Sequence, residues 1–451
     1  MMRSSFSADT YLLTTILAAA LGCAGGSGVP IPGATPHDTE ARTDGVATDD
    51  CAILCRRACH SSSGTCFRNC FSSCWGGDPP PPTYPSFVLV AGGEITGFDP
   101  ITLQNFTNTT PAAEIFQSDT NTFTATTGAM QDSRTRFYMT VLDDGRALVA
   151  GGLRIVGRGG VPPFLTRLSG AEVFAASAFT PVTQPMHDHR ADLAGAKLSG
   201  GNVLLVGGES SDTSGAVLNT AEIFQSATNA FASTHPMSRA RRNATATTVR
   251  NGTTLTVLVA GGYDGQATLS SAEVFDPALQ HFRPPRGSSS MMHPRWQQTA
   301  TLLNNGNVLL TGGLDSAFAP QRSAELYDPV TETFNSTGSM QVPRVNHTAT
   351  LLQNGQVLIA GGTTDPSLGA YNTAELYDPV TGTFAAVSST LRNARYAHTA
   401  TLLKDGRVFL IGGRLPNGNE TNTTEFFDGS SFSAGPNMLS GRAGHSAVLL
   451  P

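Results

Sequence analysis

Residues 344–384, RVNHTATLLQNGQVLIAGGTTDPSLGAYNTAELYDPVTGTF, contain the pattern that decides the fold. An arginine and a short strand-like stretch, TATLL, lead to Asn354-Gly355, a dipeptide suited to a tight hairpin turn. An apolar run, VLIA, then ends at Gly361-Gly362, and an acidic strand, AELY, is followed by a turn and a phenylalanine. The unit therefore predicts four short antiparallel strands, which is the content of one β-propeller blade.

The same unit recurs along the chain from residue 86 onward. Its double glycines are spaced by 49–59 residues and begin at Gly92, Gly151, Gly207, Gly261, Gly312, Gly361 and Gly412. Each is followed by a glutamate with an aromatic residue two positions later, at Glu114, Glu172, Glu222, Glu273, Glu325, Glu375 and Glu425. A phenylalanine closes each unit, at Phe123, Phe179, Phe231, Phe282, Phe334, Phe384 and Phe432. Seven units predict an all-β, seven-bladed propeller.

The end of the sequence indicates how the ring closes. Residues 442–450, RAGHSAVLL, copy the first strand of a unit and stop before a double glycine. The segment Phe87 to Gly93 supplies the second strand that is missing there. We therefore expect the C-terminal strand to complete blade 1, which removes a free sheet edge.

These motifs resemble the kelch repeat, whose signature is a double glycine, an acidic and aromatic strand, and a second aromatic residue at this period. The resemblance covers residues 86–451, with phenylalanine where the family usually has tryptophan. It implies a binding or interaction module, or alternatively a carbohydrate-active enzyme such as a sugar epimerase-like kelch protein. A copper radical galactose oxidase is not expected, because its Tyr-Cys crosslink needs a cysteine and none follows Cys74.

An arginine begins the first strand of every unit, at Arg134, Arg190, Arg241, Arg295, Arg344, Arg395 and Arg442. In kelch proteins this strand is innermost, so the resemblance places the arginines around one mouth of the central channel. Because the residue is present in all units, we interpret it as structural, with the repeated glutamates as candidate partners. The alternative is attraction of an anionic ligand, since guanidinium groups match carboxylates well.

The first two units break the pattern between the double glycine and the glutamate. They have 20 and 19 residues there, compared with 10–13 in the others. Loops on a rigid scaffold often carry binding groups, so we expect these two long loops to contribute to ligand binding. The candidate residues are Phe98, Asp99, Arg154, Arg158, Phe164 and Arg167.

No catalytic residues are predicted. The sequence has no G-x-S-x-G or H-E-x-x-H motif. His347, His398 and His445 share one register in consecutive units, which the repeat explains as well as a metal site does. His187-Asp188-His189 is a similarly weak pattern, so neither a metal nor a cofactor is expected.

The N-terminal residues predict export. Residues 1–22 contain Arg3 and a short apolar stretch typical of a signal peptide, and they end before Cys23 in a segment that resembles the bacterial lipobox. We expect lipidation at Cys23 and a location in the cell envelope of a bacterium, on the outer membrane. The alternative is an ordinary secretory signal with an incidental Cys23.

Residues 23–85 predict three further segments. Residues 23–50 read as a disordered tether, and residues 76–85 as a proline-rich linker. Residues 51–75 carry two runs of cysteines at four-residue spacing, which suit two antiparallel helices. Nested pairing then predicts the disulfides Cys51–Cys74, Cys55–Cys70 and Cys59–Cys66, with a thiolate metal site as the alternative.

The charge balance limits the partners. A net charge of −6 gives no basic footprint for nucleic acid. We expect a monomer attached to a membrane through its N-terminal lipid, with an unknown protein or glycan as ligand.

Overall fold

The computed structural model describes residues 85–99, 104–158, 161–210, 215–364 and 369–451. The chain divides into two units, residues 1–84 and residues 85–451. The predicted signal peptide, tether, cysteine hairpin and nearly all of the proline-rich linker lie outside the described residues. In the described part of the chain, no helix combines the length and apolar character that crossing a bilayer requires.

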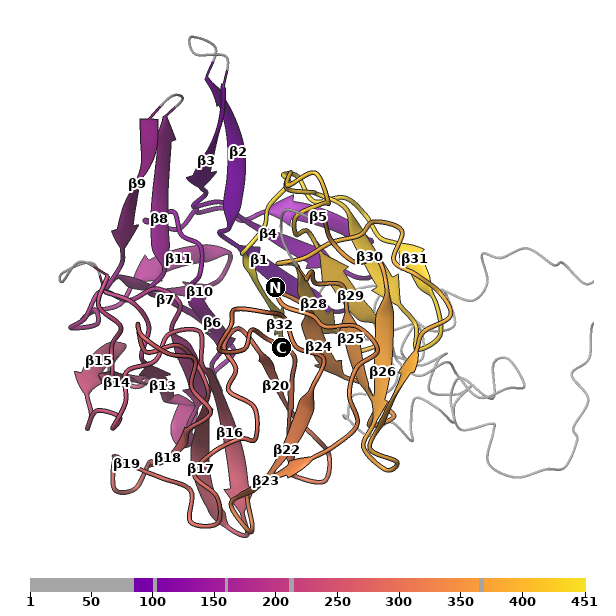
Figure 1. The fold of residues 1–451 in the computed structure, drawn as a ribbon. Coiled ribbons are helices and arrows are strands. Elements are labelled where there is room, and N and C mark those ends of the chain that lie inside the picture. Colours follow the sequence, from indigo (N-terminus) through magenta and orange to yellow (C-terminus); the bar gives the residue numbers. More distant parts are fainter. Residues whose placement is uncertain (1–84, 100–103, 159–160, 211–214, 365–368) are drawn as a thin grey trace, which may run out of the picture. The chain divides into compact units, whose positions relative to one another are not determined.

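The described residues form seven four-stranded antiparallel sheets, here called blades 1–7 (Figure 1). From the channel outward, blade 1 is β32 (Ser446–Leu450), β1 (Phe87–Ala91), β4 (Ala113–Gln117) and β5 (Thr122–Ala125). Blade 2 is β6 (Tyr138–Val141), β7 (Ala147–Ala150), β10 (Ala171–Ala175) and β11 (Ala178–Pro181). Blade 3 is β12 (Ala194–Lys197), β13 (Val203–Val206), β14 (Ala221–Gln225) and β15 (Ala230–Ser233), with the short 3₁₀ helix η1 (Ser199–Gly201) between β12 and β13.

The remaining blades repeat this order. Blade 4 is β16 (Thr245–Asn251), β17 (Thr254–Ala260), β18 (Ala272–Asp276) and β19 (His281–Arg283). Blade 5 is β20 (Thr299–Leu302), β21 (Val308–Thr311), β22 (Ala324–Asp328) and β23 (Thr333–Ser336). Blade 6 is β24 (Thr348–Leu351), β25 (Val357–Ala360), β26 (Ala374–Asp378) and β27 (Thr383–Ala386). Blade 7 is β28 (Thr399–Leu402), β29 (Val408–Ile411), β30 (Thr424–Phe427) and β31 (Phe432–Ala434).

The ring closes as the sequence predicts. Strand β32 pairs antiparallel with β1, from Phe87 opposite Leu450 to Ala91 opposite Ser446. Each innermost strand also lies beside the innermost strands of both neighbouring blades, including β32 beside β6 and β28. The C-terminal strand therefore belongs to the same sheet as the first strand of the described chain.

The core lies between the blades. The second strand of each blade is mainly apolar because both of its faces are covered, as in β1, where Val88 to Ala91 have 0% exposure. Val88 and Val90 pack against blade 7, while Leu89 and Ala91 pack against blade 2. In each blade the aromatic residue after the glutamate packs against the closing phenylalanine in a tilted arrangement, with ring centroids 4.7–5.4 Å apart. These pairs give the predicted aromatic positions a packing role.

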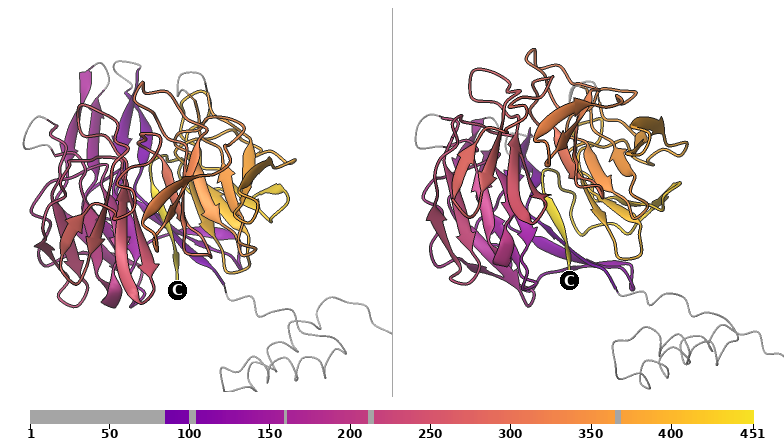
Figure 2. Two further views of the ribbon diagram at one scale, coloured as in Figure 1. Left: turned by 60° about the horizontal axis from the view of Figure 1, so that its bottom comes forward. Right: turned by 90° about the horizontal axis from the view of Figure 1, so that it is seen from below.

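Two extra hairpins extend one face of the ring. The segments expected to be long loops form β2 (Glu94–Asp99) with β3 (Gln104–Thr109), and β8 (Leu153–Arg158) with β9 (Val161–Arg167). Figures 1 and 2 show both hairpins projecting side by side, away from the end of the chain at Pro451. The N–H of Gly157 donates to Asn108 Oδ1 at 2.7 Å, which joins one hairpin to the other.

Candidate functional site

The double glycines allow each blade to pack closely against the next. Gly361 has a φ of 61°, and a Cβ there would lie 2.5 Å from the carbonyl oxygen of Arg395 in the following blade. The next residue, Gly362, donates its N–H to that same carbonyl oxygen at 2.9 Å. Equivalent bonds of 2.8–3.0 Å join every double glycine to the arginine of the next blade. Only glycine combines this backbone conformation with such a close approach.

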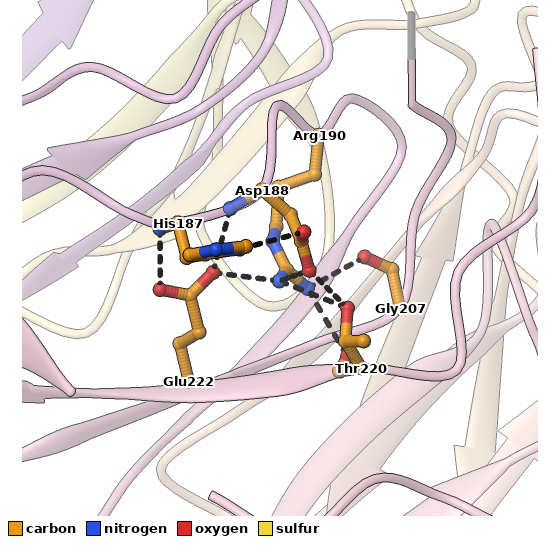
Figure 3. Close-up of polar contacts among 6 residues, drawn as sticks. All are labelled: His187, Asp188, Arg190, Gly207, Thr220 and Glu222. Atoms are coloured by element: carbon orange, nitrogen blue, oxygen red, sulfur yellow. Dashed lines mark hydrogen bonds and ion pairs between the residues drawn. The ribbon is translucent and has the colours of Figure 1, made fainter. Parts of the chain in front are cut away.

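The repeated arginines form buried ion pairs that we call the arginine–glutamate staples. In blade 3, Arg190 donates to Glu222 at 2.8 Å and to the carbonyl oxygen of Gly207 at 3.0 Å (Figure 3). Glu222 also accepts the backbone N–H of His187 at 2.8 Å. All seven pairs have distances of 2.6–3.0 Å: Arg442–Glu114, Arg134–Glu172, Arg190–Glu222, Arg241–Glu273, Arg295–Glu325, Arg344–Glu375 and Arg395–Glu425.

The observed position of the arginines differs from the predicted one. They do not begin the innermost strands but precede them; Arg190, for example, comes before β12, which starts at Ala194. Their residues are 0–1% exposed, so the guanidinium groups do not open onto the channel. Burial lowers the pKa of Arg295, and Glu325 opposes that shift. A free anion therefore has no access to these seven groups.

One end of the channel lies on the side of the two extra hairpins. The residues that surround it immediately follow the staple arginines and the double glycines in the sequence. Seven isolated antiparallel bridges join them: Glu94–Ala443, Thr135–Leu153, Ala191–Glu209, Arg242–Tyr263, Trp296–Leu314, Val345–Thr363 and Tyr396–Arg414. Unlike the staples, these residues differ from blade to blade. We call the charged and aromatic members on this rim, together with Arg136, Asp192, Arg167, Phe318 and Glu420, the mouth cluster.

One half of the mouth cluster joins blade 7 to blade 1. Arg414 pairs with Glu94 at 2.7 Å and with Glu420 at 2.8 Å. Thr135 of blade 2 donates its hydroxyl to Glu94 at 3.3 Å. The Nε of Arg136 lies 3.9 Å from Glu94, which carries the network toward blade 3.

The other half is centred on two acidic residues of blade 3. Glu209 pairs with Arg167 from the β8–β9 hairpin and with Arg242 from blade 4. Asp192 lies 3.6 Å from Arg136, whose side chain is 50% exposed. Burial raises the pKa of the Asp192 carboxyl, and Glu209 adds to the shift while Arg136 opposes it.

An aromatic surface continues the cluster into blades 4 and 5. The rings of Tyr263, Trp296 and Phe318 have centroids 5.6–5.7 Å apart, and Phe318 is 53% exposed. The guanidinium carbon of Arg242 lies 5.4 Å from the Tyr263 centroid and 5.9 Å from that of Trp296. Charge and aromatic faces thus adjoin at one end of the channel, a combination that suits a ligand with both polar and C–H surfaces.

The predicted binding residues separate into two groups. Arg167 joins the mouth cluster through Glu209. Arg154 lies elsewhere, 3.5 Å from Asp132, and Phe164 is 80% exposed on β9 opposite Val156. The other candidates lie on the same two hairpins, Phe98 and Asp99 on β2 and Arg158 on β8.

The three histidines in register are buried between blades. Their Nε2 atoms lie 3.0–3.2 Å from threonine hydroxyls, with His347 beside Thr299 and His398 beside Thr348. Burial lowers the pKa of His347 and His445 to about 3, and that of His398 well below its ordinary value. Within the described ranges, no group of three or more His, Cys, Asp or Glu residues is placed to hold a metal ion.

Sequence reasoning missed most of the mouth cluster. The predictions were based on the repeated residues and the longest loops. Four mouth residues lie instead one or two positions after a repeated arginine: Arg136, Asp192, Arg242 and Trp296. Positions flanking a repeated motif, where residue identity changes from unit to unit, would have identified them.

The ring of seven four-stranded blades, with a glycine pair and an arginine–glutamate staple in each, defines a kelch-type β-propeller. The KLHDC2/KLHL20/DRC7 Kelch-repeats domain matches residues 188–413, and the chain belongs to this kelch-repeat family. No curated protein matches the sequence.

Two solved structures resemble the chain in fold. "Structure of YjhT" has 13% sequence identity and a TM-score of 0.51, and the match covers 67% of this chain and 97% of that one. A fungal alcohol oxidase of the AA5 family, in complex with copper, has 16% identity and a TM-score of 0.54, with coverage of 68% and 66%.

Proposed function

We propose that this protein is a binding propeller displayed outside the cytoplasm, and that its ligand binds at the mouth cluster. The proposal rests on one contrast. The double glycines and staples are the same in every blade, whereas the charged and aromatic side chains of the mouth cluster belong to single blades. Kelch propellers are rigid rings, so such side chains are held ready for a ligand without a large ordering cost.

The state of Arg136 supports a ligand with an anionic group. Its contacts with Asp192 and Glu94 are 3.6 and 3.9 Å long, beyond the 2.7–2.9 Å typical of charge-assisted hydrogen bonds. The half-exposed guanidinium therefore retains donors for a carboxylate or phosphate. The Tyr263, Trp296 and Phe318 rings, further around the rim, fit the apolar or C–H-rich part of the same ligand.

The strand directions support display on an anchor. Pro85 precedes β1, and Phe87 pairs with Leu450 at the end of the sheet remote from Gly92 and the mouth. A tether that joins the propeller at Pro85 therefore attaches to the face opposite the hairpins. We propose lipidation of Cys23, together with its export signal, as the anchor.

The test is a thermal-shift screen of the full chain against neutral sugars, acidic sugars and carboxylate peptides, followed by pulldown from extracts. Ligand binding to the native state raises Tm. We expect a hit that Arg136→Ala and Trp296→Ala each weaken at least tenfold. Arg250→Ala, an exposed arginine near the other end of the channel, should leave binding unchanged. Equal effects of Arg136→Ala and Arg250→Ala would contradict the proposed site.

A carbohydrate-active enzyme, such as a sugar epimerase-like kelch protein, is the second candidate. It is favoured by Asp192, since a carboxyl with a raised pKa beside an arginine can donate a proton to a bound ligand. Proton NMR of sugars mixed with the protein would reveal changes at a ring carbon. Activity that Asp192→Asn abolishes, with ligand binding retained, would favour this candidate over a pure binding module.

A further inference from the structure

A threonine contact recurs at the outer edge of the ring, where one blade meets the next. The threonine follows the outermost strand of one blade, and its hydroxyl donates at 2.8–3.2 Å to a backbone carbonyl at the outer turn of the following blade. The pairs are Thr127 with Ser177, Thr183 with Asn229, Thr234 with Gln280, and Thr337 with Gly382. Each acceptor residue has a positive φ and comes directly before the outermost strand of its blade. The same local geometry therefore occurs at these four junctions.

This contact brings two further side chains together, from the residue after the threonine and the residue after the carbonyl. At the junction of blades 1 and 2, a Cβ on Gly128 would lie 3.5 Å from the Cβ of Ala178. At the junction of blades 2 and 3, Gln184 and Ala230 form a parallel bridge. Side chains at the two positions thus leave the backbone next to each other.

The junction of blades 3 and 4 is different because both positions are histidines. His235 and His281 are exposed, with ring centroids 5.9 Å apart and ring planes tilted by 59°. The other three junctions have no imidazole, thiol or carboxylate at either position: Gly128 and Ala178, Gln184 and Ala230, and Gly338 and Thr383. The histidine pair is therefore not part of the repeat.

The Gln280 carbonyl fixes the tautomer of His235. Nδ1 of this ring lies 2.9 Å from the carbonyl oxygen. Because a carbonyl oxygen only accepts, Nδ1 carries the proton, and the lone pair of the neutral ring is at Nε2. Among the described residues, no group forms a hydrogen bond with that Nε2 or with the His281 ring. Histidines that bind metals are commonly oriented in this way, by a hydrogen bond from the other ring nitrogen to a backbone carbonyl.

We propose that His235 and His281 together bind one first-row transition-metal cation, such as Zn²⁺ or Cu²⁺, which joins blade 3 to blade 4. With metal–nitrogen bonds of about 2.0–2.1 Å, two imidazoles on one ion have ring centroids roughly 5–6 Å apart, in agreement with the 5.9 Å between these rings. Imidazole ligands favour these cations over Mg²⁺ and Ca²⁺, which prefer oxygen. Waters complete the coordination. This site is separate from the mouth cluster and does not depend on its function.

The cation would secure a weakly held strand. Strand β19 begins at His281, has three residues and is the outermost strand of blade 4. Its only partner in the sheet is β18, to which it is joined over those three residues. A metal bond at its first residue opposes local opening of the strand, so binding to the native state raises Tm.

The test is a titration of the full chain with Zn²⁺, Cu²⁺ and Mg²⁺, followed by calorimetry and by thermal unfolding. The double variant His235→Gln/His281→Gln serves as the baseline, since it retains any metal that binds elsewhere on the chain. We expect the wild type to bind one more Zn²⁺ or Cu²⁺ ion than this baseline, with a higher Tm, and to show no difference with Mg²⁺. Each single variant should bind that ion at least tenfold more weakly.

Gln184→His combined with Ala230→His is the matched gain variant, because it places two imidazoles at the same positions of another junction. We expect it to bind one additional ion. The proposal is overturned if the wild type binds no more Zn²⁺ or Cu²⁺ than the double variant, or if one of the two histidines alone accounts for the binding. Loss of the ion in His187→Gln, at an exposed imidazole elsewhere, would also overturn it.

Discussion

The staples and the mouth cluster occupy neighbouring positions in the sequence, but the staples recur in every blade whereas the mouth residues change from blade to blade. Arg190 is fully buried and paired at 2.8 Å, whereas Asp192, two residues later, lies on the rim beside a half-exposed arginine. The residue between them forms the bridge to the next strand segment, Ala191 with Glu209. In this propeller, one or two positions along the sequence thus separate the staple residues, which recur in every blade, from the mouth residues, which do not.

The largest effect should come from breaking a staple. Arg295→Ala leaves Glu325, which is 0% exposed, as an unpaired buried charge. Loss of one partner of a buried ion pair typically costs about 3–5 kcal/mol. Urea unfolding of the full chain measures this, with the exposed Arg250→Ala as the control. A loss of unfolding free energy no greater than that of the control would contradict the structural role assigned to the staple.

The next effect depends on pH and sharpens the contrast between buried and exposed histidines. Because folding lowers the pKa of His347 and His445 to about 3, the neutral forms stabilise the fold above pH 6.5, and this stability falls as pH drops toward 3. Each histidine contributes a slope of ~1.4 kcal/mol per pH unit. The charged and titratable groups facing them include Arg344 and Arg442.

Replacement of one of these histidines by glutamine should remove its share of that slope. Gln298 already occupies the histidine register in blade 5 and donates to the carbonyl oxygen of Ala260 at 2.8 Å. We therefore expect the free energy of unfolding to fall less steeply from pH 6 to pH 4 in His347→Gln than in the wild type. Unfolding followed by circular dichroism at each pH measures this. The control is Arg250→Ala, at an exposed side chain, which should leave the slope unchanged. Identical slopes in all three proteins would contradict the assignment.

A smaller loss of stability should follow the replacement of a glycine from one of the double-glycine pairs. Gly361→Ala combines a φ of 61° with a Cβ only 2.5 Å from the Arg395 carbonyl oxygen, so we expect about 2–3 kcal/mol. Gly418→Ala has a φ of 81° and open space around the Cβ, and should lose only about 1 kcal/mol. Thermal unfolding of the pair isolates the interblade contact. Equal losses would show that backbone conformation alone explains the double glycine.

The smallest effect on stability should be at the mouth. Arg136→Ala removes a half-exposed side chain with long ion-pair contacts, so the free energy of unfolding should change by less than about 0.5 kcal/mol. The same variant should lose ligand binding, as described above. A large loss of stability would mean that Arg136 belongs to the frame.

The fold could be predicted because the repeat restricts it seven times over. The glycine pairs, the glutamates and the aromatic residues recur since each blade meets the same neighbours, and the copy of a first strand at residues 442–450 indicates the closure. The mouth cluster could not be predicted in the same way. Residues such as Arg136 and Asp192 have positive φ values, which depend on the ring rather than on local preference.

The two hairpins were expected as loops for a related reason. Gly97, Gly157 and Pro162-Pro163 are residues that interrupt strands, and they obscure the alternation of β2, β8 and β9. In the folded protein, Gly157 allows the second hairpin to approach the first, where a Cβ would lie 2.4 Å from the carbonyl oxygen of Thr107. The glycine that weakens the sequence signal is thus the residue that lets the two hairpins pack.

The pairing of β32 with β1 also constrains how the protein is made. During synthesis, β1 emerges long before β32, and it lacks its inner partner until nearly the whole propeller has left the ribosome. Closure of the ring therefore waits until β32 has been synthesised.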